Sequence, residues 1–290
     1  MKRLKDYTPS HSLIFCIDSD GCVFDTMEIK HKECFCPPYI NHFELQAISK
    51  YAREAWEYTN LYSISRGMHR FITLEMSLEL LSERAEVKER GFTVPDFSAL
   101  TAWIKETPKL SNDLLAEAIR NHPDALILNQ AYNWSLAVNE TIGAIVRGIP
   151  PFPYARKCLE IMSQFADIVI VSATQEKALI REWTEHRLDS FANVVCGQET
   201  GSKAEIIGQL RTSHPECQVI MIGDAPGDMK AAHVNDSLFY PICPGNETAS
   251  WHWLFEHMAI MENRKYNADT EAELIKAFQQ HLPTVPPWNN

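Results

Sequence analysis

Three short apolar runs, each followed directly by acidic or hydroxyl residues, constrain the fold of this chain most. The runs are Leu13 to Ile17, Ile168 to Val171 and Val219 to Ile222, and such runs are typical of strands buried on both faces of a parallel sheet. The residues that follow them are Asp18-Ser19-Asp20-Gly21, Ser172-Ala173-Thr174 and Gly223-Asp224. Polar groups at the carboxyl ends of strands in an open α/β sheet are where ligands bind. The sequence therefore predicts a binding site at one edge of one sheet.

The carboxylates of this predicted site require a cation. Asp18, Asp20 and Asp224 would repel one another at close range unless a positive charge lies among them. Mg²⁺ prefers oxygen ligands and phosphate co-ligands, so a Mg²⁺ ion among these three residues is the simplest arrangement that neutralises most of their charge. Taken singly, the Asp pair can be a solvated turn, and Lys203 can be a surface lysine at the start of a helix. Such separate explanations do not account for all the motifs lying at strand ends.

The rest of the pattern predicts a doubly wound sheet. Two further apolar segments, 193–196 and 238–242, complete five strands, and amphipathic stretches predict helices between them. These helices are expected over residues 154–165, 175–188, 202–210 and 228–234, with two more in the tail over 248–263 and 270–281. Strands that alternate with helices indicate an α/β fold with a parallel sheet.

A second domain is expected between the first strand and Pro150. About 120 residues separate the two, far more than a loop of a compact domain. Helical periodicity dominates this gap, over residues 43–58, 68–90, 97–104, 112–121 and 125–145. We therefore expect a Rossmann-like core made of residues 1–26 and 149–290, and a mostly α-helical domain, 27–148, inserted after the first strand.

The four motifs, in this order and each on the expected element, resemble those of the haloacid dehalogenase superfamily. They are Asp18-Ser19-Asp20-Gly21, Ser172-Ala173-Thr174, Lys203 and Gly223-Asp224-Ala225-Pro226-Gly227-Asp228. The resemblance covers the first strand and about residues 150 to 245, and it does not cover the insert. It implies a Rossmann-like sheet with strand order 5-4-1-2-3, phosphoryl transfer through an aspartate nucleophile, and an insert that acts as a cap over the active site.

The resemblance also implies a role for each motif residue. Asp18 would attack phosphorus, and Asp20 would be the general acid and then the general base, with its backbone carbonyl on the metal. Ser172 would donate to a phosphoryl oxygen, although an N-cap of the next helix is an alternative. Lys203 would stabilise negative charge on Asp18. Asp224 would ligate Mg²⁺, and Asp228 would ligate it or orient its water.

Two candidate sites lie in the insert. The stretch Arg66-Gly67-Met68-His69-Arg70 carries two arginines and a histidine beside a glycine. Arg66, His69 and Arg70 either bind an anionic or hydroxylated leaving group or belong to the start of a surface helix. Histidine and cysteine residues at positions 31, 34, 36 and 42 are soft-metal ligand types, but their spacing fits no common zinc site.

Composition limits the partners. Charged residues make up 22% of the chain and its net charge is −11, with no basic stripe in either predicted domain, so a nucleic acid partner is not expected. No apolar run approaches the ~20 residues that span a bilayer, so we expect no membrane partner. The run of residues 13–17 is too short for a signal peptide, and the eight cysteines form no Cys-x-x-Cys pair. The expected location is the cytoplasm, and the expected state a monomer or weak dimer.

Together these observations predict a Mg²⁺-dependent phosphatase that hydrolyses a small phosphate monoester. An acid at Asp20 favours phosphate esters, because the dehalogenases and phosphonate-cleaving members of the superfamily lack one there. A phosphomutase of the same superfamily would use the same core residues, so it stays open as an alternative. A non-catalytic binding protein on this fold is a second alternative, against which the intact Asp18, Asp20, Lys203 and Asp224 count.

Overall fold

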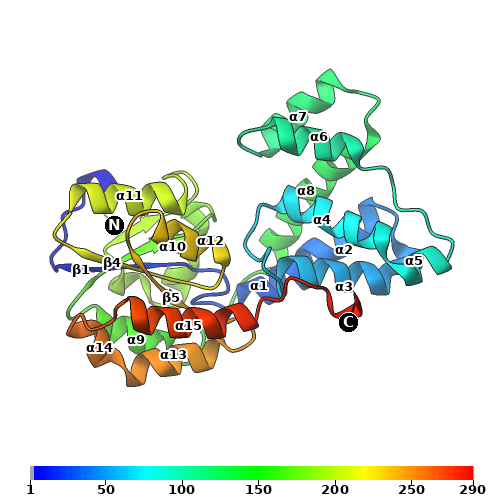
Figure 1. Ribbon diagram of the computed structural model, residues 1–290. Helices are drawn as coiled ribbons and strands as arrows, with labels where there is room; N and C mark the ends of the chain where they lie inside the picture. The colour runs from blue at the N-terminus through cyan, green and yellow to red at the C-terminus, as the bar shows by residue number, and fades with distance from the viewer. Residues whose placement is uncertain (1–2, 290) are drawn as a thin grey trace. The chain divides into compact units, whose positions relative to one another are not determined.

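The chain contains a five-stranded parallel sheet in the order β3-β2-β1-β4-β5. Figure 1 labels β1, β4 and β5 of this sheet, with helices on either side of it. The computed structural model describes residues 3–289. The strands are β1 (Leu13–Ile17), β2 (Asp167–Val171), β3 (Val194–Cys196), β4 (Gln218–Gly223) and β5 (Leu238–Pro241). The predicted α/β fold and strand order are confirmed, and each predicted strand end lies within one residue of the observed one. Because β1 pairs with both β2 and β4, the chain reverses its direction of winding beside β1, where such sheets bind ligands.

Each strand is buried on both faces, which explains why its sequence is apolar without alternation. Alternate side chains of β1 enter two separate hydrophobic clusters: Phe15 lies in one with Ile17, and Ile14 lies in the other with Cys16. Helices α9 (Ala155–Met162), α10 (Glu176–Glu185), α13 (Glu247–Glu256) and α14 (Met258–Glu262) contribute buried residues to the first cluster. Helices α11 (Lys203–Ser213), α12 (Pro226–His233) and α15 (Ala268–Gln280) contribute to the second.

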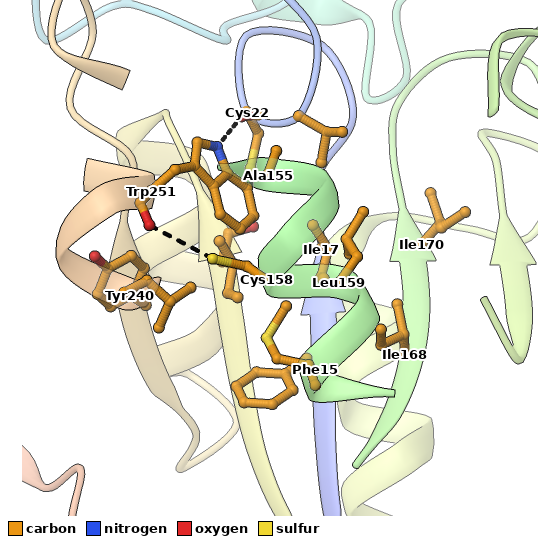
Figure 2. Packing of buried hydrophobic residues seen from close by; sticks show 14 of the residues in the cluster. Phe15, Ile17, Cys22, Ala155, Cys158, Leu159, Ile168, Ile170, Tyr240 and Trp251 are labelled. Atoms are coloured by element: carbon orange, nitrogen blue, oxygen red, sulfur yellow. Dashed lines mark hydrogen bonds between the residues drawn. The ribbon is translucent and has the colours of Figure 1, made fainter. Parts of the chain in front are cut away.

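The packing of α9 and α13 on the sheet fixes the loop that follows β1. Figure 2 shows Cys158 and Leu159 of α9 facing Phe15 and Ile17 of β1. The buried indole Nε1 of Trp251, on α13, donates to the backbone oxygen of Cys22 at 2.8 Å. This bond anchors a loop that has no regular secondary structure of its own to the hydrophobic core. Burying an indole together with its hydrogen-bond partner makes the anchor favourable.

Contacts within the chain divide it into two compact units. Unit 1 consists of the chain up to Met27 and Arg147–Pro283, and unit 2 consists of Glu28–Val146 together with the segment from Thr284 on. The domain boundaries expected from the sequence are 26/27 and 148/149, with the residues after Pro283 in the core, and they stay a prediction. The contacts group the segment after Pro283 with unit 2.

Unit 2 is helical, and the structure places no strand among its described residues. Its segments, with α1 crossing the boundary from unit 1, are α1 (Thr26–Ile29), the π-helical η2 (Lys30–Phe35), α2 (Cys36–His42), the 3₁₀ turn η3 (Gln46–Ile48), α3 (Ser49–Asn60), α4 (Arg70–Glu83), α5 (Ala85–Glu89), α6 (Ser98–Glu106), α7 (Asn112–Asn121) and α8 (Leu126–Ile145). Further 3₁₀ turns are η1 (Leu4–Asp6), η4 (Asp189–Phe191) and η5 (Pro287–Asn289). Across residues 3–289, no helix has the length and apolar character needed to cross a membrane.

Two helices predicted in unit 2 are interrupted. The expected helix over 43–58 begins only at Ser49, because Glu44 has a left-handed backbone, with φ at 56°. The expected helix over 68–90 divides at Arg84, whose ψ of 126° is extended. Aromatic residues fill the core of this unit, with the rings of Trp56 and Trp134 only 5.6 Å apart.

The segment after Pro283 packs on unit 2 through Trp288. The guanidinium of Arg84 lies over the Trp288 ring at 4.4 Å and over the Tyr51 ring at 4.6 Å. The side chain of Arg84 is only 4% exposed, and it also pairs with Glu54 at 2.5 Å. The Trp288 ring meets Tyr58 edge-on at 5.6 Å. Trp288 therefore covers a buried cation, and this is why the tail groups with the insert.

We expect Trp288→Ala to destabilise unit 2. The change removes a cation–π contact and an aromatic pair, together worth about 1–2 kcal/mol. Urea denaturation should show this loss in the unfolding transition of the variant. Val285→Ala is the matched control, because Val285 lies in the same segment with 47% of its surface exposed. Equal stability of the two variants would contradict the role given to Trp288.

Candidate active site

The pairing of β1 with β4 brings the first and last motifs together. Ile17 lies opposite Ile222 in the register of the two strands, and the Asp18 amide donates to the Ile222 carbonyl at 3.0 Å. Asp18 and Asp224 therefore follow neighbouring strand ends. Both are buried, with 6% and 2% of their surfaces exposed. Carboxylates are seldom so deeply buried unless they are paired or bind a cation.

Lys203 lies between two of these carboxylates. Its Nζ is 2.6 Å from Asp18 Oδ2 and 2.5 Å from Asp228 Oδ1. Lys203 is the first residue of α11, whose start is fixed by a capping box in which Ser202 accepts from the Glu205 amide and Glu205 accepts from the Ser202 amide. Such a box satisfies amide groups that the helix itself leaves unpaired. The local sequence thus sets the position from which Lys203 extends to Asp18.

Asp228 organises the loop after β4. Its Oδ2 accepts from the amides of Asp224 and Ala225, at 3.2 and 3.1 Å. A Cβ atom on Gly223 would lie 2.4 Å from this same oxygen, so a side chain at position 223 would displace the Asp228 carboxylate. The glycine is therefore required by the close approach of Asp228, and Asp228 in turn orients both Lys203 and Asp224.

Asp18, Asp224 and Asp228 form a group that could hold a metal ion. One ligand oxygen from each lies within 4.8 Å of the others, and no other group of this kind is present among residues 3–289. The histidines and cysteines between residues 31 and 42 do not form one. Three carboxylates beside one ammonium leave an excess of negative charge. All three ligands offered are hard oxygens, which suits Mg²⁺ and not a soft metal.

Burial and the neighbouring charges both shift the pKa values of Asp18 and Lys203. Burial raises the pKa of Asp18 most, Lys203 lowers it, and the carboxylates of Asp228 and Asp224 raise it, which together give a pKa of about 8. Burial alone would lower the pKa of Lys203, but Asp18 and Asp228 outweigh it, so this pKa is raised. Lys203 therefore stays charged, and a cation beside Asp18 would favour its ionised form.

We expect the contribution of Asp18 to the stability of the metal-free protein to fall as the pH rises from about 4 to about 8. Between the ordinary Asp pKa of 3.8 and the raised value of about 8, folded Asp18 retains a proton that the unfolded chain loses. The contribution of Asp18 to the free energy of unfolding therefore decreases with pH in this window. Asp18→Asn cannot titrate, so its melting temperature in excess chelator should decline less between pH 5 and pH 8. Parallel declines for variant and wild type would contradict the raised pKa.

Asp20 and Ser172 are joined through Thr174. The Thr174 hydroxyl donates to Asp20 Oδ2 at 2.8 Å, and the Thr174 amide donates to Ser172 Oγ at 3.2 Å. The hydroxyl of Thr26 donates to the other oxygen of Asp20. Ser172 does not cap α10, which begins at Glu176 after the N-cap Gln175. Two hydroxyls thus fix the orientation of the Asp20 carboxylate, separately from the Asp18 group.

The three candidate residues of the insert have local roles within unit 2. His69 is the N-cap of α4, where its Nδ1 accepts from the Phe71 amide at 3.4 Å. Arg66 is buried and donates to the Leu61 carbonyl at 3.0 Å. Arg70 donates to Ser135 Oγ and Asn139 Oδ1, at 3.1 and 2.8 Å. The helix start that the sequence offered as one alternative is therefore present, and substrate binding by these residues stays a prediction.

Sequence reasoning gave no role to several residues that support the site. Thr26 and the Thr174 side chain hold Asp20, Gly223 makes room for Asp228, and Ser19 contacts α10. Thr174 lies two residues after Ser172, where a hydroxyl at a strand end could have signalled a polar role. Thr26 begins the short helix α1, which no periodicity in the sequence predicted, so no pattern indicated its partner.

Comparison with known proteins gives structural neighbours but no match in sequence. No family model matches the chain, and no curated protein matches it. The solved structures it resembles include three haloacid dehalogenase-like hydrolases and a putative β-phosphoglucomutase from Thermotoga maritima. One, from Streptococcus pneumoniae, has 18% identity and a TM-score of 0.38, over 83% of this chain and 90% of that chain. Another, from Xanthomonas campestris, has 6% identity and a TM-score of 0.47, over 89% and 96%.

A third neighbour is a subfamily IA hydrolase of the same superfamily, from Geobacter sulfurreducens. It has 13% identity and a TM-score of 0.39, over 81% of this chain and 89% of that chain. These neighbours carry the superfamily name that the four motifs indicated. At such identities and TM-scores, the function of this chain has to be derived from its own residues.

Proposed function

We propose that the protein is a Mg²⁺-dependent phosphatase of the haloacid dehalogenase superfamily, acting on a small phosphate monoester through an aspartyl phosphate. The observation that carries this proposal is the Asp18–Lys203–Asp228 arrangement beside Asp224. It combines a buried carboxylate nucleophile, a fixed ammonium and a cluster of oxygen ligands at one sheet edge. Phosphoryl transfer depends mainly on such positioning and on charge stabilisation.

Mg²⁺ fits the donor set. Asp18 and Asp224 would hold the ion, with the Asp20 backbone carbonyl as a third protein ligand. Asp228 is already engaged by Lys203 and two amides, which favours an orienting role over direct ligation. When bound, the ion would neutralise charge on the carboxylates and on the phosphoryl oxygens.

The first half of the reaction forms the phosphoryl enzyme. An oxygen of Asp18 bonds to phosphorus as the bond from phosphorus to the ester oxygen breaks. Protonated Asp20 gives its proton to the departing alkoxide, which leaves as an alcohol. Lys203, already bonded to Asp18, would stabilise the negative charge on the transferred group.

The second half releases phosphate. Asp20, now ionised, takes a proton from a water molecule as the water oxygen bonds to phosphorus. The bond from phosphorus to Asp18 then breaks and restores the carboxylate. Because Thr26 and Thr174 hold Asp20 from both of its oxygens, the carboxyl group can give and take the proton from one fixed position.

The metal requirement is tested by phosphate release from 4-nitrophenyl phosphate. We expect release in Mg²⁺ and its loss in excess chelator, with recovery when Mg²⁺ is restored. Three adjacent carboxylates would repel a phosphate without a cation. Full activity in chelator would refute the metal assignment. No release under any condition would favour the non-catalytic alternative.

Replacement of Asp18 and replacement of Asp20 should have different effects on the kinetics. Asp18→Asn should lower kcat by at least about a hundredfold for every substrate, because the nucleophile is lost. Asp20→Asn should slow an alkyl phosphate more than 4-nitrophenyl phosphate, because an alkoxide needs the proton that a nitrophenolate does not. Asp113→Asn, at an exposed position on α7, is the matched control. A similar loss for both substrates in Asp20→Asn would contradict the acid role.

Of the residues in the insert, Arg70 has the best support as a substrate ligand. Its hydrogen bonds are all to neutral groups, and burial, not a neighbouring carboxylate, shifts its pKa. Burial lowers its pKa to about 10, which reflects a charge without a counter-ion nearby. An anionic group on the substrate would supply one.

We therefore expect Arg70→Ala to raise KM for an anionic natural substrate more than for 4-nitrophenyl phosphate. A desolvated charge-assisted contact contributes about 1.5–3 kcal/mol, or roughly tenfold or more in KM. Arg66→Ala and His69→Ala test the other two candidates in the same assay. Equal KM changes for both substrates would leave these residues with structural roles only. A screen of phosphorylated metabolites supplies the natural substrate.

A further inference from the structure

Ser19, between the two motif aspartates, makes more contacts than a spacer needs. Its side chain is fully buried. The Trp183 indole Nε1 donates to Ser19 Oγ at 3.0 Å, and Ser19 Oγ donates to Glu182 Oε2 at 3.1 Å. Both partners lie on α10, far from Ser19 in the sequence. One hydroxyl therefore accepts one bond and donates another, which fixes its direction.

The backbone of Ser19 connects the same point to the proposed nucleophile. The Ser19 amide donates to Asp18 Oδ1 at 2.7 Å. Its carbonyl accepts from the amides of Val23 and Phe24, at 2.9 and 3.1 Å. Side chain, amide and carbonyl thus join α10, the Asp18 carboxylate and the loop after Asp20 at a single residue.

Trp183 strengthens this connection. It is fully buried, and its ring meets Phe24 edge-on at 5.8 Å. The same tryptophan therefore contacts the start of the loop through Ser19 and its end through Phe24. An indole with both a hydrogen bond and an aromatic contact is held in one orientation. The loop that carries Asp18 and Asp20 is supported from α10 at both ends.

We propose that Ser19, Glu182 and Trp183 are positioning residues that hold the Asp18 carboxylate in the geometry needed for metal binding and nucleophilic attack. The inference rests on the proposed function and adds residues to that site. Asp18 already has Lys203 on Oδ2, so the Ser19 amide on Oδ1 completes its orientation. Shifting the amide would let the carboxylate rotate about Lys203.

The proposal predicts that kcat and the affinity for Mg²⁺ fall while KM for the substrate stays unchanged. Removing a residue that orients a metal ligand typically costs about 10- to 100-fold in affinity or activity. We expect Ser19→Ala to lower kcat by about tenfold or more and to weaken Mg²⁺ binding, measured by calorimetry, by a similar factor. The loss should be equal for 4-nitrophenyl and alkyl phosphates, because it concerns the nucleophile and not the acid.

Partner variants test whether the three residues act together. Trp183→Phe keeps the ring near Phe24 but removes the donor, and Glu182→Gln keeps the shape but removes the charge. Each should give a smaller loss in kcat than Ser19→Ala. The double variant Ser19→Ala/Trp183→Phe should lose no more than Ser19→Ala alone, since both act through one hydroxyl. If the two substitutions acted independently, the double variant would lose more kcat than Ser19→Ala alone.

The control removes an equivalent buried bond elsewhere in unit 1. Tyr266→Phe deletes a hydrogen bond of 2.6 Å from a buried hydroxyl to the Phe239 carbonyl. It should lower the melting temperature without changing kcat or Mg²⁺ affinity. If Ser19→Ala behaves like Tyr266→Phe, the network is structural and the proposal is wrong.

The two readouts separate this proposal from the proposed function. Hydrolysis by the wild type with unchanged kinetics and Mg²⁺ binding in Ser19→Ala would overturn the network and keep the phosphatase. Absence of hydrolysis, with Mg²⁺ binding that Ser19→Ala weakens, would overturn the phosphatase and keep the network. A wild type that neither hydrolyses phosphate esters nor binds Mg²⁺ would overturn both.

Discussion

The ion pairs of Lys203 are the interaction on which the rest of the site depends. One ammonium contacts Asp18 and Asp228, and Asp228 in turn fixes the turn that carries Asp224. Three carboxylates could not lie this close in a buried place without such a charge. Lys203 reaches them only because β1 and β4 are neighbours and because a capping box starts α11 just where it does. Fold and site are therefore linked through one residue.

Charged groups and neutral groups hold the carboxylates of the site in different ways. Lys203 and Asp228 act directly on the charges. A second layer of neutral hydroxyls acts on orientation, with Thr26 and Thr174 on Asp20 and Ser19 on the loop between the aspartates. Neutral donors add direction without adding charge, which suits a place where the electrostatic balance is already strained. Rigid support of this kind is what a site for phosphoryl transfer requires.

Much of the core could be predicted from the sequence, because its signals are local. An apolar run such as Leu13–Ile17 is buried on both faces wherever it occurs in a parallel sheet, and the residue after it lies at the strand end. The partners of Asp20 could not be predicted, since the bond from Thr174 joins residues 154 positions apart. The sequence also did not predict the helix breaks at Glu44 and Arg84. Periodicity indicates which face of a helix is apolar, but it does not indicate where the backbone leaves the helical region.

The packing of Trp288 on unit 2 determines which fragments of the chain keep that unit intact. An insertion is ordinarily connected to its host by two crossings, but here the chain passes between the units a third time after Pro283. A fragment cut at 28 and 146 would lose the ring that covers Arg84. A fluorophore attached near Trp288 would belong to the insert, although Trp288 follows unit 1 in the sequence. Together with a second fluorophore on unit 1, it would report the distance between the two units through energy transfer.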